Sequence, residues 1–281
     1  MAGLDATSGR MPGPFRCRGM TRLFRDLYPP FILLLLLGLS AEGGLDLAGV
    51  PAYLCPRPSE VLRAAVLHQD LLGEALGRTG LAALIGLLGS AVGGGMLALA
   101  LSLNAWVRKA VYPLMVFFQT VPIVAIAPMM VIWVGYGRPA VILSALIVSL
   151  SPIVANSLQG LLSAEPALVD LFRMKQASGL KILLKLRIPS AIPQFLTGLR
   201  IAAGLSVIGA IVGEFVADTF DGGGGIGTLI ESALKEQETP LVFAALMGST
   251  LLGLTFFLAV GGLSHLALRH LHIAETRSAQ G

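Results

Sequence analysis

The sequence predicts an all-α integral membrane protein with about six transmembrane helices. Of its 281 residues, 55% are hydrophobic and only 13% are charged, about half the charged share of an ordinary soluble domain. The mean hydropathy is +0.80, and apolar runs of about 20 residues recur, the length that an α-helix needs to cross a bilayer. These runs do not alternate polar and apolar residues, as the strands of a membrane barrel would.

The chain begins with a basic tail, residues 1–26, which shows no hydrophobic periodicity and which we expect to be disordered and cytoplasmic. The first and weakest span is expected at residues 27–47, where Glu42 and Asp46 close the apolar run. No small-residue cleavage site follows Leu39, so we expect this span to stay as an anchor. An external Pro-rich segment with an interfacial helix is expected to complete the unit 27–72.

Residues 73–268 are expected to form the transmembrane core, with a polar loop that carries a short helix at 226–235. Residues 269–281 would form a second cytoplasmic tail. Prolines within the third and fourth spans are expected to kink them. Glycine makes up 34 residues, and the pairs Gly89/Gly93 and Gly209/Gly213 have the GxxxG spacing that lets membrane helices pack closely. The five core spans are expected at 76–103, 111–134, 140–161, 195–217 and 241–268.

The placement of Lys and Arg predicts the orientation, because cytoplasmic loops carry an excess of these residues. With a cytoplasmic N-terminus and six spans, fifteen of the twenty cations fall on the cytoplasmic side, and the C-terminus is cytoplasmic as well. This topology places residues 162–194 in the cytoplasm and the Gly-rich loop before the short helix outside. It also explains the net charge of +4 without a nucleic acid partner.

Several chemistries are absent from the sequence. It contains no GxxxxGK[ST] motif, so we do not expect the chain to bind ATP phosphates itself. It also lacks HExxH, GxSxG and any Cys/His cluster, so an active site, a resident cofactor and a metal site are not expected. The cysteines, Cys17 and Cys55, would lie on opposite sides of the membrane.

The stretch 160–200 carries six of the twenty Lys and Arg residues between two apolar runs. It predicts a helix at 167–175, a turn of small residues at Ala177–Gly179, and a second helix that Pro189 and Pro193 stop. We interpret it as a cytoplasmic docking element, whose apolar side chains fill a groove on a partner. The alternative is an amphipathic loop that lies on lipid headgroups. The apolar candidates are Leu171, Phe172, Leu180 and Leu183.

This stretch resembles the EAA loop of permease subunits of binding-protein-dependent ABC importers. Asp170 stands at the Glu position of that loop, Leu171 and Phe172 at its alanines, and Gln176 at its glycine. The stretches 119–137, 149–161 and 189–215 are similar to the type I, nitrate/sulfonate/taurine-type branch, which includes carriers of pyrimidine precursors and riboflavin-like compounds. The resemblance covers about residues 25–268.

The resemblance implies a permease of the bacterial inner membrane that pairs with a second permease copy. Two ABC ATPase subunits would bind and hydrolyse ATP, and an extracytoplasmic binding protein would deliver a small organic or anionic solute. We expect replacement of Gly179 by Pro to break the turn and uncouple transport. The residues implied in ATPase coupling are Asp170, Leu171, Phe172, Gln176, Ala177, Ser178, Gly179, Ile188 and Pro189.

Three polar residues inside spans are candidates for the translocation path: Glu214, Asn156 and Gln119. A carboxylate within a membrane is costly enough to indicate function, but Glu214 would also serve as a structural partner for Arg, Ser or Thr on a neighbouring helix. An alternative function is an ion-gradient-driven secondary transporter in which Glu214 carries protons, and a third is a membrane scaffold. The motifs favour pyrimidine-precursor or riboflavin-like solutes over taurine, without identifying the substrate.

Overall fold

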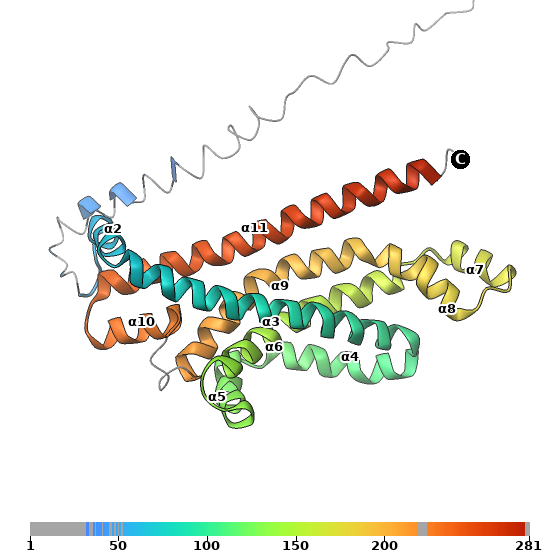
Figure 1. Cartoon of the computed structure of the whole chain (residues 1–281), viewed down its shortest axis with the longest axis horizontal. Coiled ribbons are helices and arrows are strands. Elements are labelled where there is room, and N and C mark those ends of the chain that lie inside the picture. The colour runs from blue at the N-terminus through green and yellow to red at the C-terminus, as the bar shows by residue number, and fades with distance from the viewer. Residues whose placement is uncertain are drawn as a thin grey trace, which may run out of the picture.

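The computed structural model describes residues 53–217 and 224–278, together with scattered positions between 32 and 51. Within these residues every regular element is a helix (Figure 1), so the predicted all-α membrane fold is confirmed. The expected first span, 27–47, lies largely outside the described residues. Four helical segments are long and apolar enough to cross a membrane: α3 (Gln69–Leu103), α6 (Arg138–Leu162), the continuous helix 179–217, and residues 239–269 of α11 (Thr239–Ser278).

Helix α6 lies at the centre of the bundle, where it packs against α3 and against α9 (Ile188–Ala217). Close approach to α9 depends on the pair Gly209 and Gly213. A Cβ added to Gly209 would lie 2.8 Å from the Cα atom of Ala145, and one added to Gly213 would lie 2.9 Å from that of Val141. Because these contacts are with backbone, larger residues would separate the helices. The predicted role of this pair is confirmed.

The contact between α3 and α6 has its close backbone approach at Gly86, where an added Cβ would lie 2.9 Å from the Leu146 backbone nitrogen. A Cβ added to Gly89 would meet only the flexible Leu146 side chain, and one added to Gly93 would lie 4.0 Å from the nearest atom. This second GxxxG pair is therefore not a close backbone contact. Instead, the buried hydroxyl oxygens of Ser90 and Ser149 lie 2.5 Å apart across the interface.

The third predicted span, 111–134, is not one helix, and this expectation was wrong. The chain forms α4 (Ala105–Thr120) and α5 (Ile123–Val134), separated by extended backbone at Val121 and Pro122. A proline disfavours helical backbone at the residue before it, because its ring clashes with that residue. Pro113 and Pro128, by contrast, lie inside α4 and α5 without ending them.

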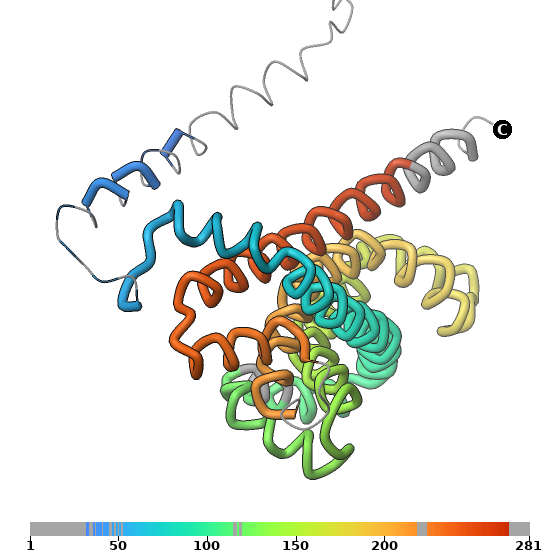
Figure 2. The backbone as a smooth tube through the Cα atoms, turned by 60° about the vertical axis from the view of Figure 1, so that its left-hand side comes forward, coloured from blue at the N-terminus to red at the C-terminus, as the bar shows by residue number. Residues whose placement is uncertain are grey.

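Three shorter elements gather at one end of the bundle. Helix α2 (Pro58–Leu67) packs against the start of α11. Helix α10 (Ile226–Lys235) folds back against the last turns of α9 and the first turns of α11 (Figure 2). The bounds of α10 are those expected from the sequence. The turn between α5 and α6 lies at the same end, because the Gly137 backbone N–H donates to the Ala217 carbonyl at 2.9 Å.

The opposite end carries α7 (Pro166–Met174) and α8 (Gly179–Ile182), which extend beyond the bundle in Figure 1. The helix expected at 167–175 is thus confirmed, but Pro189 and Pro193 do not stop the second helix. A π-helical turn, η1 (Leu183–Arg187), joins α8 to α9, and both prolines lie within α9. In this turn the Ile188 N–H bonds to the Leu183 carbonyl, five residues back. We infer that this wider turn accommodates the Pro189 ring, which an ordinary helical turn would not.

Candidate functional site

Glu214 anchors the start of α10 from inside the bundle. It lies in the last turn of α9, and only 3% of its surface is exposed. Its Oε2 atom accepts a hydrogen bond from the Gly227 backbone N–H at 2.8 Å, and its Oε1 atom accepts one from the Thr79 hydroxyl at 2.7 Å. The Thr79 oxygen in turn accepts the Ile226 N–H at 2.8 Å. The carboxylate thus satisfies donors at the first turn of α10, where the helix dipole also favours an anion.

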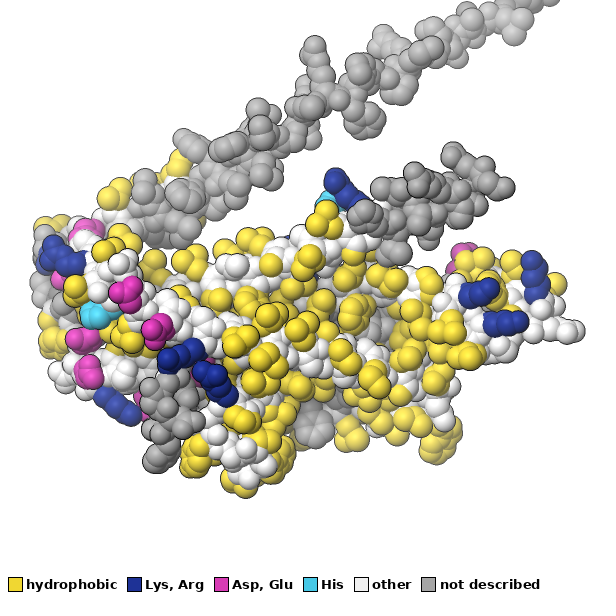
Figure 3. Space-filling view, in the orientation of Figure 1, with side chains coloured by type: hydrophobic (Ala, Val, Ile, Leu, Met, Phe, Trp, Pro, Cys, Tyr) yellow, Lys and Arg dark blue, Asp and Glu magenta, His cyan; other side chains and the backbone are white. Residues whose placement is uncertain are grey.

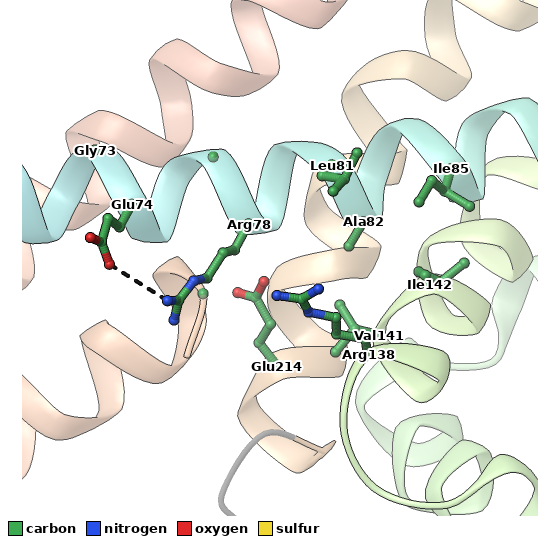
Figure 4. A pocket seen from close by; sticks show the side chains of 12 residues that line it. Gly73, Glu74, Arg78, Leu81, Ala82, Ile85, Arg138, Val141, Ile142 and Glu214 are labelled. Carbon is green, nitrogen blue, oxygen red and sulfur yellow. Dashed lines mark ion pairs between the residues drawn. The ribbon is translucent and has the colours of Figure 1, made fainter. Parts of the chain in front are cut away.

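A cavity of about 390 Å³ opens beside this carboxylate, between α3, α6 and the end of α9. Arg78 and Arg138 extend toward Glu214 from opposite sides of it (Figure 4). Arg78 also pairs with Glu74 at 3.5 Å across one turn of α3. Thr79 is therefore the structural partner on a neighbouring helix that the sequence suggested for Glu214. The same carboxylate also lines a charged cavity at the α10 end of the bundle.

A second group of cavities follows α6 toward the α7 end of the bundle. One, of about 570 Å³, is lined by α6, α9 and the break between α4 and α5. Another, of about 540 Å³, lies between α4 and α6 and includes Arg108 and Lys109. Asn156 lines both cavities, and its Nδ2 atom donates to the Pro152 carbonyl at 2.8 Å. Asn156 therefore lies at the border of both cavities.

Ser151 adds an unusual polar atom to the larger of these two cavities. Its hydroxyl oxygen is buried and has no hydrogen-bond partner among the described residues. A buried hydroxyl without a partner is costly, so this oxygen is a candidate contact for a bound solute. The three predicted path residues do not meet, however: Glu214 lines the cavity at the other end, and Gln119 lies in α4, where its side chain is not among those described.

The turn after α7 is centred on Gln176, not on Gly179. Gln176 has a φ of 54°, the left-handed conformation in which glycine is preferred. The Gln176 N–H donates to the Arg173 carbonyl at 2.9 Å, and the Ala177 N–H donates to the Phe172 carbonyl at 3.0 Å. These two bonds form a Schellman motif, the common glycine-ended helix terminus. The expectation of a turn of small residues at Ala177–Gly179 was therefore wrong, because Ser178 already caps α8 by accepting the Lys181 N–H.

Helix α7 has no buried residue although one side of it is apolar. Leu171 and Met174 are 46% and 82% exposed, and Leu180 at the start of α8 is 64% exposed. Phe172 is half-buried. Asp170 forms an exposed ion pair with Arg173 at 3.5 Å, which contributes little to stability.

The base of the loop belongs to the bundle. Leu183, expected to fill a partner's groove, is only 5% exposed, so that expectation was wrong. Ile188 packs against the buried cluster between α3 and α6, and Pro189 follows it within α9. Of the predicted coupling residues, those from Asp170 to Gly179 lie on the protruding part, whereas Ile188 and Pro189 support its base.

Sequence reasoning missed Thr79, Gly225, Ser151 and Met174. A threonine within an apolar helix is common, and its link to Glu214 joins residues 135 positions apart. Gly225 was expected only as part of the Gly-rich loop before the short helix, yet an added Cβ there would overlap the Glu214 carboxylate. Met174 could have been found as the third member of the apolar series Leu168, Leu171 and Met174, which recurs every three residues.

A multi-span bundle with inner cavities and a protruding helical loop defines a membrane transport subunit. Residues 81–272 match the family described as "Binding-protein-dependent transport system inner membrane component", and the chain belongs to this family. It is a permease component of an ABC importer, which works with ATPase and solute-binding partners. In this family the ATPase is a separate subunit, so the permease is not itself an enzyme.

Two curated relatives are similar over nearly the whole chain. The formylaminopyrimidine transport permease protein ThiX of Halalkalibacterium halodurans is 35% identical and covers 89% of this chain and 98% of its own length. The riboflavin transport system permease protein RibX of Chloroflexus aurantiacus is 32% identical, with coverage of 85% and 88%. Among solved structures, a chain of the MetNI methionine ABC transporter, in an inward-facing conformation, shares the fold with a TM-score of 0.54 at 18% identity. This alignment covers 75% of our chain and 98% of the MetNI chain.

These comparisons support the importer and not the alternative of a proton-driven secondary transporter that uses Glu214. The scaffold alternative is likewise replaced by a transport function. The hydrogen bonds of Glu214 agree with this outcome, because both carboxylate oxygens accept from donors that hold α10.

Proposed function

We propose that the segment from Asp170 to Gly179 docks the chain onto an ABC ATPase that binds ATP. The observation that carries this proposal is the exposed apolar side of α7 and α8, at Leu171, Met174 and Leu180, on elements that extend beyond the bundle. An amphipathic helix with its apolar side unburied suits insertion into a groove of a partner. Movement of the ATPases would then reach α9 directly, because α8 and η1 continue into it.

The distribution of charge supports the proposed sidedness. Lys and Arg side chains gather over α7 and α8, whereas acidic side chains mixed with arginines gather over α2 and the start of α3 (Figure 3). With the α7 end in the cytoplasm of a bacterial cell, both termini would be cytoplasmic, and the end that carries α2 and α10 would receive the solute-binding protein.

We assign the translocation path to the cavities at Ser151 and Asn156. The larger cavity reaches the surface of the chain, since the lining residue Ile208 is 51% exposed. A polar path must be shielded from lipid, so a second permease copy would close it. The lining of the larger cavity is mainly apolar, with one free hydroxyl and one amide, and this composition suits the flat face of an organic solute. A heteroaromatic ring, as in the compounds that the names of the ThiX and RibX relatives give, offers such a flat face.

Co-purification tests the docking proposal. The chain is co-expressed with its P-loop ATPase, and the ATPase retained on the tagged permease is measured. Leu171→Asp and Met174→Asp place a charge on the docking side and should abolish retention. Leu67→Asp is the matched control, because Leu67 is 75% exposed at the opposite end, on α2. Full retention by the α7 variants would disprove the assignment.

A further inference from the structure

Arg200 is a cation inside a transmembrane helix without an acidic partner. It lies on the exposed side of α9, twelve residues after Ile188, or about 18 Å along the helix. Its guanidinium carbon lies 4.2 Å from the centre of the Phe257 ring of α11. Within the described chain no carboxylate forms an ion pair with it. A charge on the exposed side of a membrane span is costly unless an anion or water reaches it.

The glycine opposite Arg200 keeps space for its side chain. A Cβ added to Gly261 of α11 would lie 3.1 Å from Nε and 3.3 Å from Cζ of Arg200. The stacked ring and the small residue hold the guanidinium between the two helices. Stacking on a ring uses none of the five N–H donors, so the group retains the planar fork that binds phosphate oxygens in pairs.

An apolar groove runs between α9 and α11 away from the α7 end; Arg200 does not line it, but Ile201, the next residue, does. It has a volume of about 530 Å³, and Phe257 lines it. Its two hydroxyls, of Ser249 and Thr250, already donate to the Leu246 carbonyl. On α9 it extends from Ile201 to Ile211, a rise of about 15 Å. This length is half the thickness of a hydrocarbon core of about 30 Å, the depth of one leaflet.

The chemistry of the groove distinguishes between occupants. Its lining is apolar apart from two hydroxyls that are already bonded within α11, so it offers no free polar group and suits an acyl chain. A cation at one end of a groove one leaflet deep matches the shape and charge of a phospholipid.

We propose that this groove, with Arg200 at its mouth, binds one phospholipid with an anionic headgroup, from the leaflet on the α7 side. The headgroup phosphate pairs with the guanidinium, and one acyl chain lies along Gly204 and Gly253. Because α9 continues from α8 and η1, the lipid would contact the helix that joins the docking loop to the bundle.

Native mass spectrometry tests this proposal on the permease–ATPase complex, reconstituted in vesicles of phosphatidylethanolamine and phosphatidylglycerol and then extracted in mild detergent. The wild-type complex should retain phosphatidylglycerol in preference to phosphatidylethanolamine. Arg200→Gln should lower this retention about tenfold, the effect of losing a charge-assisted hydrogen-bonded pair. Arg63→Gln, on α2 at the other end of the bundle, is the matched control and should leave it unchanged.

A second pair of variants tests the groove separately from the charge. Gly253→Leu fills it, and no atom lies within 4 Å of the added Cβ, so the fold should tolerate the change. Gly262→Leu also meets nothing within 4 Å but lies outside the groove. Only Gly253→Leu should reduce retention. Equal retention of both lipids, or no effect of Arg200→Gln and Gly253→Leu, would overturn the proposal. So would cross-linking of Leu254→Cys, which lines this groove but not the cavity at Ser151, to residues 27–47 or to a second copy.

Discussion

The Thr79 hydroxyl oxygen lies 2.7 Å from Glu214 Oε1 and links α3 to the end of α9. The same oxygen accepts the Ile226 N–H of α10 at 2.8 Å. Thr79 is fully buried, so three segments that are distant in sequence meet at one hydroxyl from which water is excluded. The contact explains why a carboxylate is tolerated in the last turn of a transmembrane helix: its oxygens are occupied by donors rather than left unpaired.

Replacing Thr79 by Val keeps the shape of the side chain but removes the hydroxyl. It leaves the Ile226 N–H and one oxygen of Glu214 without this partner, so the free energy of unfolding should fall by about 1–3 kcal/mol. Thermal unfolding of the purified protein in detergent measures this as a lower midpoint. Thr250→Val is the control, because Thr250 is exposed and its hydroxyl bonds only to Leu246 of its own helix. Equal midpoints for the two variants would contradict the prediction.

Gly225→Ala should weaken the same contact by crowding it. An added Cβ would overlap the Glu214 carboxylate, and overpacking of this kind costs about 1–3 kcal/mol. We expect a lower unfolding midpoint and faster proteolysis of the segment before α10. Gly204→Ala provides the comparison, since no atom lies within 4 Å of its added Cβ. That change should be neutral or slightly stabilising, because alanine favours helix over glycine.

The sequence predicted where most helices lie, but it did not predict which prolines end a helix and which lie inside one. Polar residues flank α10 so clearly that its bounds, 226–235, were predicted correctly. Pro122 separates α4 from α5, whereas Pro189 and Pro193 lie inside α9. A π-turn precedes Pro189, and hydropathy carries no information about such a change in hydrogen-bond register.

The sequence predicted a candidate site residue only where the residue type alone, such as a carboxylate in an apolar run, indicates a function. Glu214 was found because a carboxylate in an apolar run is rare, and Asn156 for a similar reason. Their surroundings depend on which helices touch, so the partner Thr79 and the free hydroxyl of Ser151 carried no local signal. Gln176 shows another limit: it has the left-handed φ of 54°, whereas the small residues Ala177–Gly179 had indicated a turn one to three residues later.

Ser151→Ala should stabilise the protein and impair transport. Removing a buried hydroxyl that has no partner should raise the free energy of unfolding by about 1 kcal/mol, while a solute loses a contact in the path. Ser149→Ala, two residues away, is the matched change, because the Ser149 hydroxyl donates to the Ala145 carbonyl at 2.6 Å and contacts Ser90. It should destabilise the protein and leave the solute affinity of transport unaltered. Uptake assays in vesicles and unfolding midpoints measure the two effects, and a lower midpoint for Ser151→Ala would refute the argument.

Proline at two positions of the loop should have opposite effects. Gln176→Pro cannot adopt the φ of 54° found there, since proline fixes φ near about −65°, and it also loses the N–H bond to the Arg173 carbonyl. Gly179 is the first residue of α8, and Ser178 before it has extended backbone (φ −63°, ψ 153°). Both features suit a proline at position 179, so our expectation that Gly179→Pro breaks the turn is withdrawn.

The readout is solute-stimulated ATPase activity of the reconstituted complex with its binding protein. Gln176→Pro should abolish the stimulation while membrane insertion remains normal, and Gly179→Pro should retain it. The reverse result would move the mechanically important turn to residue 179. Full stimulation in both variants would show that the end of α7 does not transmit ATPase movement, because a helix terminus that has lost its left-handed residue cannot hold α7 and α8 in one fixed arrangement.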